Sequence, residues 1–553
     1  MRSICSTTVA CALLLASTAN AQGAGPVAAI QPVTVVAPVP VAPPASIKAA
    51  GPADPISTAP EDVKQFGSLY LRCDGKPNNM TEGESLARLV GAITLLAIFA
   101  PSPEAPDPSK RLFGEAGVKA CTKLLDDPKQ ETNTIRRLPL ILGRAAHQIE
   151  ARNYEAALAD VAKARGEAAA SGLAGNPYFE RSLGLSFNIL ESAALLRLKR
   201  FEAAQAVGMR SALAMPHSFY AQVASFPYSN YLERMSPDEL RFYELRTRAN
   251  SLQGTALAIR LEDAGRFAEA AAVREDFVKA MSILSDGNPA SWTLILAAID
   301  HALAGNWQAA EARAAQAQAN MDRLIGEGKA EDNQSVLVEQ FDLFQVLKLM
   351  HDGKIDEARR NFSARSRWTA PSFGMVLAVN STLRKGARPE ALFGALAMSP
   401  EQLRAKRIDE SLAQVFEADK NNRLLFSWIL PYANIRNFEG LSRLIWNVEK
   451  AGIIGKAPLK NSKMYFMSIS SSALTQPDAL LLHAALQAKQ RGFDGFIAMN
   501  RPAEPQSMLV YFGRASDPDM PKGSFLNADA VIAELRQIIP SPDELAARRK
   551  AKT

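Results

Sequence analysis

The sequence predicts a mainly α-helical protein, an irregular array of helical hairpins followed by a small C-terminal α/β module. Two observations favour this fold class. A short motif, in which an aromatic residue or isoleucine precedes an alanine by three positions, occurs five times within residues 135–365, each time after a short turn. Beyond residue 456 the pattern changes to short segments in the order β-α-β-β-α. Repeated hairpins hide their apolar faces by stacking, so the array builds surfaces instead of one enclosed pocket.

The residues of the motif have a packing role. An alanine at a helix crossing lets two helices approach closely, and the larger side chain fills the gap beside the turn. We therefore expect each copy at the bend between two paired helices. The five pairs are Tyr154 and Ala157, Phe201 and Ala204, Phe267 and Ala270, Trp307 and Ala310, and Ile355 and Ala358.

The first 21 residues are expected to be a secretory signal peptide. Arg2 supplies a positive start, Val9 to Ala16 form a short apolar stretch, and Ala19-Asn20-Ala21 fits a cleavage site. Residues 22–60 are rich in proline and alanine and predict a disordered, extended leader. The sequence therefore favours export to a bacterial periplasm, and it leaves open an association with the outer membrane or the cell wall.

Residues 61–134 predict an N-terminal helical cap that contains the two cysteines of the mature chain, Cys73 and Cys121. In an oxidising compartment an even pair favours a disulfide, and two separate buried thiols are the alternative. The same region holds an apolar run, Leu89 to Ala100, which at 12 residues is too short to span a bilayer. We expect a buried helix over residues 81–100 and no transmembrane helix in the mature chain.

The hairpins of residues 135–365 resemble those of the tetratricopeptide family, whose unit is a pair of antiparallel helices. Successive turn residues lie 47, 66, 40 and 48 residues apart, compared with about 34 in the family, so we expect longer helices or inserted segments. Upstream, Cys73-Asp74-Gly75 and Ala120-Cys121-Thr122 are similar to motifs that precede the array in exported bacterial repeat proteins, which implies that the cysteines pair. The small or apolar residues that match the family's first-helix position are Ala145, Ser192, Ala258, Ala298 and Val346.

Three regions follow the array. Residues 366–455 predict further helical hairpins, with a helix start at the capping signature Ser399-Pro400-Glu401-Gln402. Residues 456–540 predict the β-α-β-β-α module, and residues 541–553 a basic tail. Within the module, Ala484 to Ile497 is similar to a segment of small envelope lipoproteins of unknown function, which supports an envelope setting and implies no activity.

The sequence gives little sign of catalysis. Its five histidines do not pair at i+3 or i+4, and it lacks metalloprotease, nucleophile-elbow and phosphate-loop motifs. We therefore predict no catalytic residue, no metal and no cofactor, and we interpret the protein as a non-enzyme. The net charge of +6 comes without a Lys/Arg block, which argues against nucleic acid as a partner and permits attraction to an acidic membrane surface or wall polymer.

The densest aromatic cluster, residues 219–243, is the candidate partner-binding surface. Tyrosine and phenylalanine beside arginine suit a peptide or a sugar ring, and the same rings can instead form the core of an irregular hairpin. His301, on the first helix of the fourth hairpin, can line an inner face or can serve packing alone. The candidate residues are Phe219, Tyr220, Phe226, Tyr228, Tyr231, Arg234, Arg241 and His301.

These observations predict an exported periplasmic scaffold or adaptor, active in cell-envelope maintenance or assembly. It would hold a protein or peptide partner in a helical-repeat groove. The alternative is a cell-wall or polysaccharide-associated enzyme or accessory factor, with its site in residues 219–243 or in the C-terminal module. A structural spacer in an envelope assembly is a third hypothesis.

Overall fold

The computed structural model describes residues 60–78, 104–126, 131–284, 289–329, 334–421, 424–433, 435–448, 464–468, 476–501 and 504–551. The expected signal peptide, the leader up to residue 59 and the expected helix of residues 81–100 lie outside these ranges. The described residues form two compact units. The N-terminal unit comprises residues 60–164 and 421–429, and the repeat unit comprises residues 165–420 and 430–551, with the gaps given above. The last four hairpins, the C-terminal module and the 366–455 segment apart from residues 421–429 thus share one unit.

The N-terminal unit is built around the expected cysteine pair. Cys73 on α3 (Leu69–Asp74) is bonded to Cys121 on α5 (Gly114–Asp126), with 4.9 Å between the two Cα atoms. The disulfide is therefore confirmed, and both cysteines are fully buried. A buried ion pair adds to this core, because Arg136 on α6 (Thr134–Glu150) donates to both oxygens of Asp74 at 2.6 and 2.9 Å. The short helices α2 (Pro60–Phe66) and α21 (Leu424–Ser427) complete the unit.

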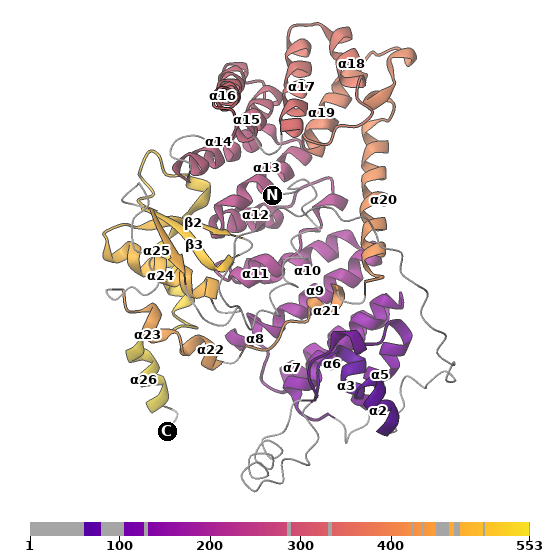
Figure 1. The fold of residues 1–553 in the computed structure, drawn as a ribbon, viewed down its shortest axis with the longest axis vertical. Helices are drawn as coiled ribbons and strands as arrows, with labels where there is room; N and C mark the ends of the chain where they lie inside the picture. Colours follow the sequence, from indigo (N-terminus) through magenta and orange to yellow (C-terminus); the bar gives the residue numbers. More distant parts are fainter. Residues whose placement is uncertain are drawn as a thin grey trace. The chain divides into compact units, whose positions relative to one another are not determined.

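The fold is mainly helical with a small C-terminal sheet, as predicted (Figure 1). Each of the five motif copies begins the second helix of a pair at its aromatic residue or isoleucine. The pairs are α6 with α7 (Tyr154–Ala170), α9 (Leu183–Arg197) with α10 (Phe201–Ala214), α13 (Gly254–Asp263) with α14 (Phe267–Leu284), α15 (Ser291–Leu303) with α16 (Trp307–Gly326), and α17 (Gln334–His351) with α18 (Ile355–Ser363).

All five hairpin turns have the same backbone geometry. One residue of each turn is left-handed, with φ of 64° at Arg152, 58° at Lys199, 73° at Gly265, 81° at Gly305 and 76° at Gly353. The N–H of the next residue donates to the carbonyl five positions earlier, for example from Asn306 to His301 at 2.8 Å. This pattern ends the first helix and satisfies its last carbonyl groups. The motif alanines, Ala157, Ala204, Ala270, Ala310 and Ala358, are all fully buried.

Lys199→Gly is expected to stabilise the repeat unit. A side chain in the left-handed region costs about 1 kcal/mol, which glycine avoids. Lys199 is exposed and makes no ion pair with a described residue, so little else is lost. Denaturant unfolding should show the gain, and the matched variant Gly305→Ala should lose a similar amount. If Lys199→Gly destabilised the protein, the shared turn geometry would be contradicted.

Two segments depart from the simple hairpin pattern. Between hairpins two and three the chain forms α11 (Phe219–Ala224), a 3₁₀ turn at Ser229–Tyr231 (η4), α12 (Pro237–Ala249) and a second 3₁₀ turn at Ser251–Gln253 (η5). After hairpin five come α19 (Phe373–Arg384) and α20 (Pro400–Ala418). The predicted capping signature is confirmed, because the Ser399 hydroxyl accepts from the Gln402 N–H at 3.3 Å and Gln402 accepts from the Ser399 N–H at 2.8 Å.

The later helices of the 366–455 segment, for which the sequence predicts further hairpins, are short. The first, α21, spans only Leu424–Ser427, because Pro431 keeps the preceding backbone out of the helical region. The second, α23, spans Ser442–Ile445, after α22 (Ile435–Glu439). Side chains at both places are nevertheless buried, including Phe426 and Ile445.

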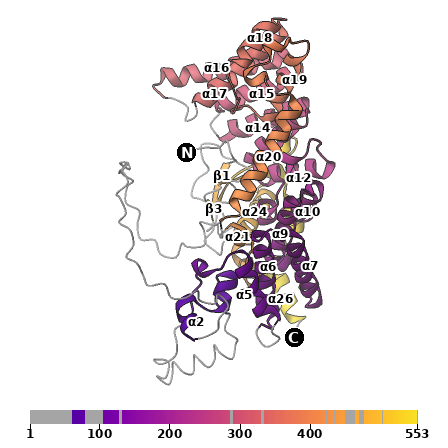
Figure 2. The same ribbon diagram turned by 90° about the vertical axis from the view of Figure 1, so that its right-hand side faces the viewer.

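The C-terminal module has the predicted order, with one more strand. Its antiparallel sheet has the strand order β1-β3-β2-β4, and β4 (Phe525–Asn527) is too short to give an alternating pattern. Helix α24 packs on β2 and β3, while α12 contacts β2 and β4. Figure 2 gives a second view of these elements. The other elements are β1 (Met464–Ser468), α24 (Gln476–Gln490), β2 (Gly495–Arg501), β3 (Glu504–Gly513), α25 (Ala528–Leu535) and, within the predicted basic tail, α26 (Pro542–Lys550).

Candidate partner-binding site at helix α20

The predicted aromatic cluster lies mainly in the interior of the repeat unit. The rings of Tyr231 and Phe201 stack with centroids 5.0 Å apart, and the hydroxyls of Tyr228 and Ser192 are 3.4 Å apart. Burial raises the pKa of Tyr231 to about 12, as expected for a phenol away from water. Phe219, Tyr220, Phe226 and Tyr228 are likewise buried or partly buried, and so are Phe242 and Tyr243. The rings therefore fill the gap between hairpins two and three.

Only two members of the candidate set are exposed, Arg234 and Arg241. The backbone explains why the aromatic segment turns inward. The Phe226 N–H donates to the Gly208 carbonyl at 3.0 Å, and a Cβ on Gly208 would lie 2.4 Å from the Phe226 oxygen. A glycine on α10 thus lets the inserted segment approach closely. Because these rings pack in the interior, the structure gives no support to a sugar-binding or catalytic role for residues 219–243.

His301 takes part in a closed ion network. Its Nε2 lies 3.1 Å from Glu275 Oε1, and Arg313 Nε donates to the same oxygen at 2.9 Å. These side chains line a shallow pocket of about 390 Å³ between α14, α15 and α16. Because the imidazole is already bonded to a carboxylate, its position is explained by packing between hairpins.

A buried charge network was not foreseen from the sequence. Arg274 on α14 donates through Nε to Asp300 Oδ2 at 2.9 Å and through Nη2 to Glu262 Oε1 at 2.6 Å. All three side chains are almost fully buried. Burial and the adjacent Glu262 raise the pKa of Asp300 well above its usual range, against the opposing effect of Arg274. The network joins hairpins three and four through their interiors.

A sequence signal for such networks exists at one repeat position. The residue five places before the left-handed turn residue is His147, Arg260 or Asp300 in hairpins one, three and four. Each of these polar residues is almost fully buried. A polar residue recurring at a buried repeat position needs a partner, and aligning the turns would have shown it.

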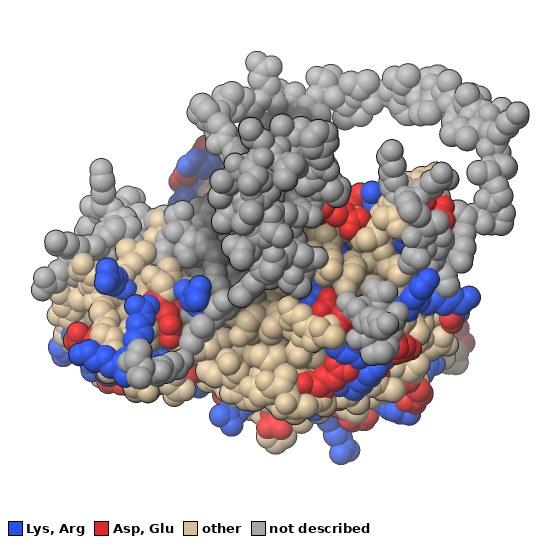
Figure 3. Space-filling view, turned by 90° about the horizontal axis from the view of Figure 1, so that it is seen from below, with Lys and Arg blue, Asp and Glu red and all other residues tan. Residues whose placement is uncertain are grey.

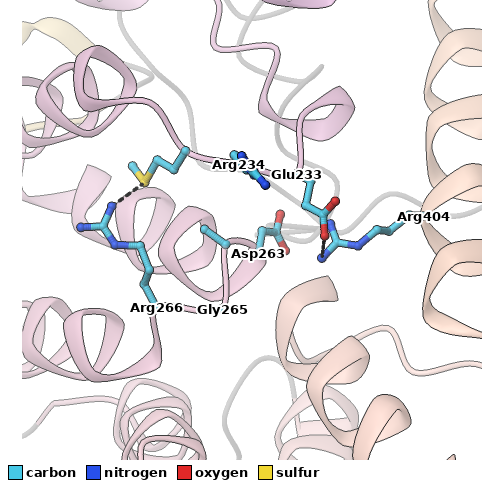
Figure 4. Close-up of a pocket in the computed structure, with 8 residues that line it drawn as sticks. Glu233, Arg234, Asp263, Gly265, Arg266 and Arg404 are labelled. Atoms are coloured by element: carbon cyan, nitrogen blue, oxygen red, sulfur yellow. Dashed lines mark hydrogen bonds and ion pairs between the residues drawn. The ribbon is translucent and has the colours of Figure 1, made fainter.

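A second pocket lies at the turn of hairpin three. It has a volume of about 490 Å³ and lies between the loop before α12, the α13–α14 turn and α20. Figure 4 shows Asp263, Arg266 and Arg404 around it. Its lining residues are Glu233, Arg234, Met235, Asp263, Ala264, Gly265, Arg266 and Arg404.

Charges of both signs meet at this pocket. Asp263 accepts from Arg407 Nη1 at 3.0 Å and from the Gly374 N–H at 2.8 Å. Burial nevertheless raises the pKa of Asp263, because desolvation outweighs the nearby Arg407. Arg404 lies 3.5 Å from Glu233. Arg234 is exposed and has no ion pair with a described residue, so it is available to an acidic group of a partner.

On the face that Figure 3 draws, no large patch of one charge is visible over the described part of the chain. Lysine and arginine alternate with aspartate and glutamate over its described part. Among the described residues, no cluster of three or more histidine, cysteine or acidic side chains is arranged to hold a metal ion. No helix in the described part of the chain combines the length and apolar character needed to cross a bilayer.

The contact between the segments flanking hairpin two and the C-terminal module includes a buried acid, Asp478. Its Oδ1 accepts from the Phe219 N–H at 2.8 Å, next to the ion pairs of Glu534 with Arg181 and His217, each 2.7 Å long. Burial raises the pKa of Asp478 to about 6, although Arg181 opposes the shift. The folded protein therefore keeps a proton that the unfolded chain has lost. The free energy of unfolding should fall as the pH rises from about 4 to about 6.

Asp478→Asn is expected to remove that part of the pH dependence. At pH 7 it should raise the free energy of unfolding by up to about 3 kcal/mol, because asparagine can still accept from Phe219 without a buried charge. Denaturant unfolding at several pH values measures the effect. Asp529→Asn, which removes an exposed partner of Lys489, is the matched control and should change little. An unchanged pH dependence in Asp478→Asn would contradict the assignment.

Comparison with protein-family models, with curated proteins and with solved structures gives no match to this chain. The fold and the pocket define a class of protein: an array of helical hairpins with an appended antiparallel sheet and an open, charged pocket at one hairpin turn.

Proposed function

We propose that this protein is an exported envelope scaffold or adaptor that binds a protein or peptide partner through its hairpin array. The observation that carries the proposal is the charged pocket at the turn of hairpin three. It is open to solvent, it presents Arg234 without an ion pair among the described residues, and it lies between helices α13 and α20. Charged groups at an open pocket are suited to recognising a partner's charged side chains.

Two further observations support the setting. The shared turn and the buried alanines agree with a tetratricopeptide-like array, a fold used for protein binding. The Cys73–Cys121 disulfide agrees with an oxidising compartment such as the periplasm, where the signal-like N-terminus would direct the chain. We place its role in cell-envelope maintenance or assembly on these grounds.

The partner would bind at the turn edge and not in a groove along α9 and α15. Helix α9 is buried at nearly every position from Leu183 to Arg197, and α15 is buried from Thr293 to Asp300. A first helix that lined an open groove would instead show an exposed polar face. The edge formed by the hairpin turns is therefore the better candidate surface.

Site-specific photo-crosslinking in the cell tests the proposal. A photo-reactive amino acid at position 234 should give a discrete crosslinked species with one protein, because Arg234 faces the open pocket. The matched control is the same amino acid at Gln318, an exposed position of α16 that does not line the pocket. Crosslinks of equal yield at both positions, or none at 234, would contradict the proposal.

A further inference from the structure

Helix α20 is attached to the repeat unit in an unusual way. Over its 19 residues, Leu412 is the one fully buried side chain. Leu403, Ile408 and Val415 are only partly buried, so its apolar contact is shallow. The helix is stabilised locally instead, by the capping box at Ser399 and by its own side-chain pairs. It therefore can persist as a helix without deep packing.

Arginine side chains make most of the polar attachment. Arg407 donates to Asp263 at 3.0 Å, also bonds to Asn230, and lies over the Phe373 ring at 4.4 Å. One turn earlier, Arg404 pairs with Glu233 at 3.5 Å. The two arginines are three residues apart, so they lie on one face of the helix. The surface beneath α20 thus consists of acceptors: Glu233, Asp263 and the Asn230 amide oxygen.

The far end of α20 is fixed to hairpin two. Arg197, at the end of α9, donates through Nε to Asp419 Oδ2 at 2.8 Å, and both side chains are nearly buried. Helix α20 therefore bridges the turn ends of hairpins two and three. Its N-terminal half borders the open pocket through Arg404, whose pair with Glu233 is more exposed than the Arg197–Asp419 pair.

We propose that α20 is a displaceable self-ligand, and that the acceptor surface beneath its N-terminal half binds a partner's helix that carries two arginines at positions i and i+3. This deepens the proposed function, on which it rests, by naming the partner's chemistry and a means of regulation. Because α20 is part of the same chain, it competes with any partner helix at a high effective concentration. It therefore covers the acceptor surface until a partner helix of matching charge displaces it.

The choice of an arginine helix follows from the acceptor set. Without α20, Asp263 would lose its bond to Arg407, and the acceptor geometry left behind is complementary to a guanidinium group. Arginine is the side chain that can bond to the Asp263 carboxylate and the Asn230 amide together, as Arg407 does. A lysine or an apolar helix would leave one of these acceptors unsatisfied.

The test uses the full chain and a fluorescein-labelled peptide of residues 399–419. The variant R404Q/R407Q should loosen α20, seen as faster amide hydrogen exchange over residues 400–410, and should bind the peptide at least about ten-fold more tightly than the unaltered chain. The matched peptide with glutamine at both arginine positions should not bind. The variant Arg367→Gln, which removes an exposed 3.7 Å pair with Glu410 elsewhere on α20, should behave as the unaltered chain.

Several results would overturn the proposal. The first is slow hydrogen exchange of the α20 amides in R404Q/R407Q, and the second is equal binding of the two peptides. The third is the absence of peptide binding although α20 exchanges fast. The fourth is dimerisation of the unaltered chain, which would make a second copy the occupant of the surface. If the circular dichroism of R404Q/R407Q shows that the variant is unfolded, R407K is used in its place. Lysine keeps the positive charge but cannot bond to Asp263 and Asn230 together. Peptide binding is independent of the crosslink at position 234, so failure of one experiment leaves the other standing.

Discussion

Replacing Arg274 with methionine is expected to destabilise the repeat unit by about 3–5 kcal/mol at neutral pH. The guanidinium is the shared donor to Glu262 and Asp300, and all three side chains are almost fully buried. Without it, two carboxyl groups remain together in the interior. The loss should be smaller near pH 5, because the pKa of Asp300 is raised and its protonation removes part of the uncompensated charge. Chemical denaturation at the two pH values measures both effects.

The control for Arg274→Met is Arg266→Met. Arg266 also belongs to hairpin three and bonds to Glu269 at 2.6 and 2.7 Å, but that pair is largely exposed. Its loss should cost well under about 1 kcal/mol. Asp300→Asn should cost less than Arg274→Met at pH 7, because burial and Glu262 raise the pKa of Asp300 and so disfavour a charge at that position. Equal effects of Arg274→Met and Arg266→Met would contradict the buried network.

The second large effect is expected for the disulfide. The double variant C73S/C121S should lower the free energy of unfolding of the N-terminal unit by about 3–4 kcal/mol. The bond joins residues 48 positions apart, so its loss frees a long loop in the unfolded chain. It also links α3 to α5, whose packing supplies much of that unit's core.

Reduction provides the control for this variant. Dithiothreitol should lower the unfolding midpoint of the unaltered chain by a similar amount and should leave C73S/C121S unchanged. Limited proteolysis within residues 104–164 reports on the N-terminal unit alone. A midpoint that is the same with and without reductant would show that the bond does not stabilise the unit.

The turns could be predicted from the sequence because their causes are local. A left-handed residue, a short bend and an alanine three positions into the next helix are all encoded within a few residues. Even the fifth copy, with Val346 and Ala358, buries both side chains. The order of the C-terminal strands was predictable for the same reason, since each longer strand has its own apolar pattern.

The site could be predicted only in part. The aromatic cluster was found, but whether a ring faces solvent depends on which distant segment covers it, and the Gly208 contact is not visible in the pattern. The capping signature located the start of α20. Its attachment through Arg407 to Asp263 joins residues 144 positions apart, and no local rule pairs them. Among the candidate residues Arg234 is exposed, and its role in binding stays a prediction.

A double-mutant cycle between Arg274 and Asp300 tests the stacking of hairpins most directly. Arg274 belongs to hairpin three and Asp300 to hairpin four, so their 2.9 Å bond exists only if the two hairpins pack side by side. With methionine and asparagine as replacements, the stacked array predicts a coupling free energy of at least about 1.5 kcal/mol at pH 7. A coupling of zero within error, with both single variants folded, would contradict the array.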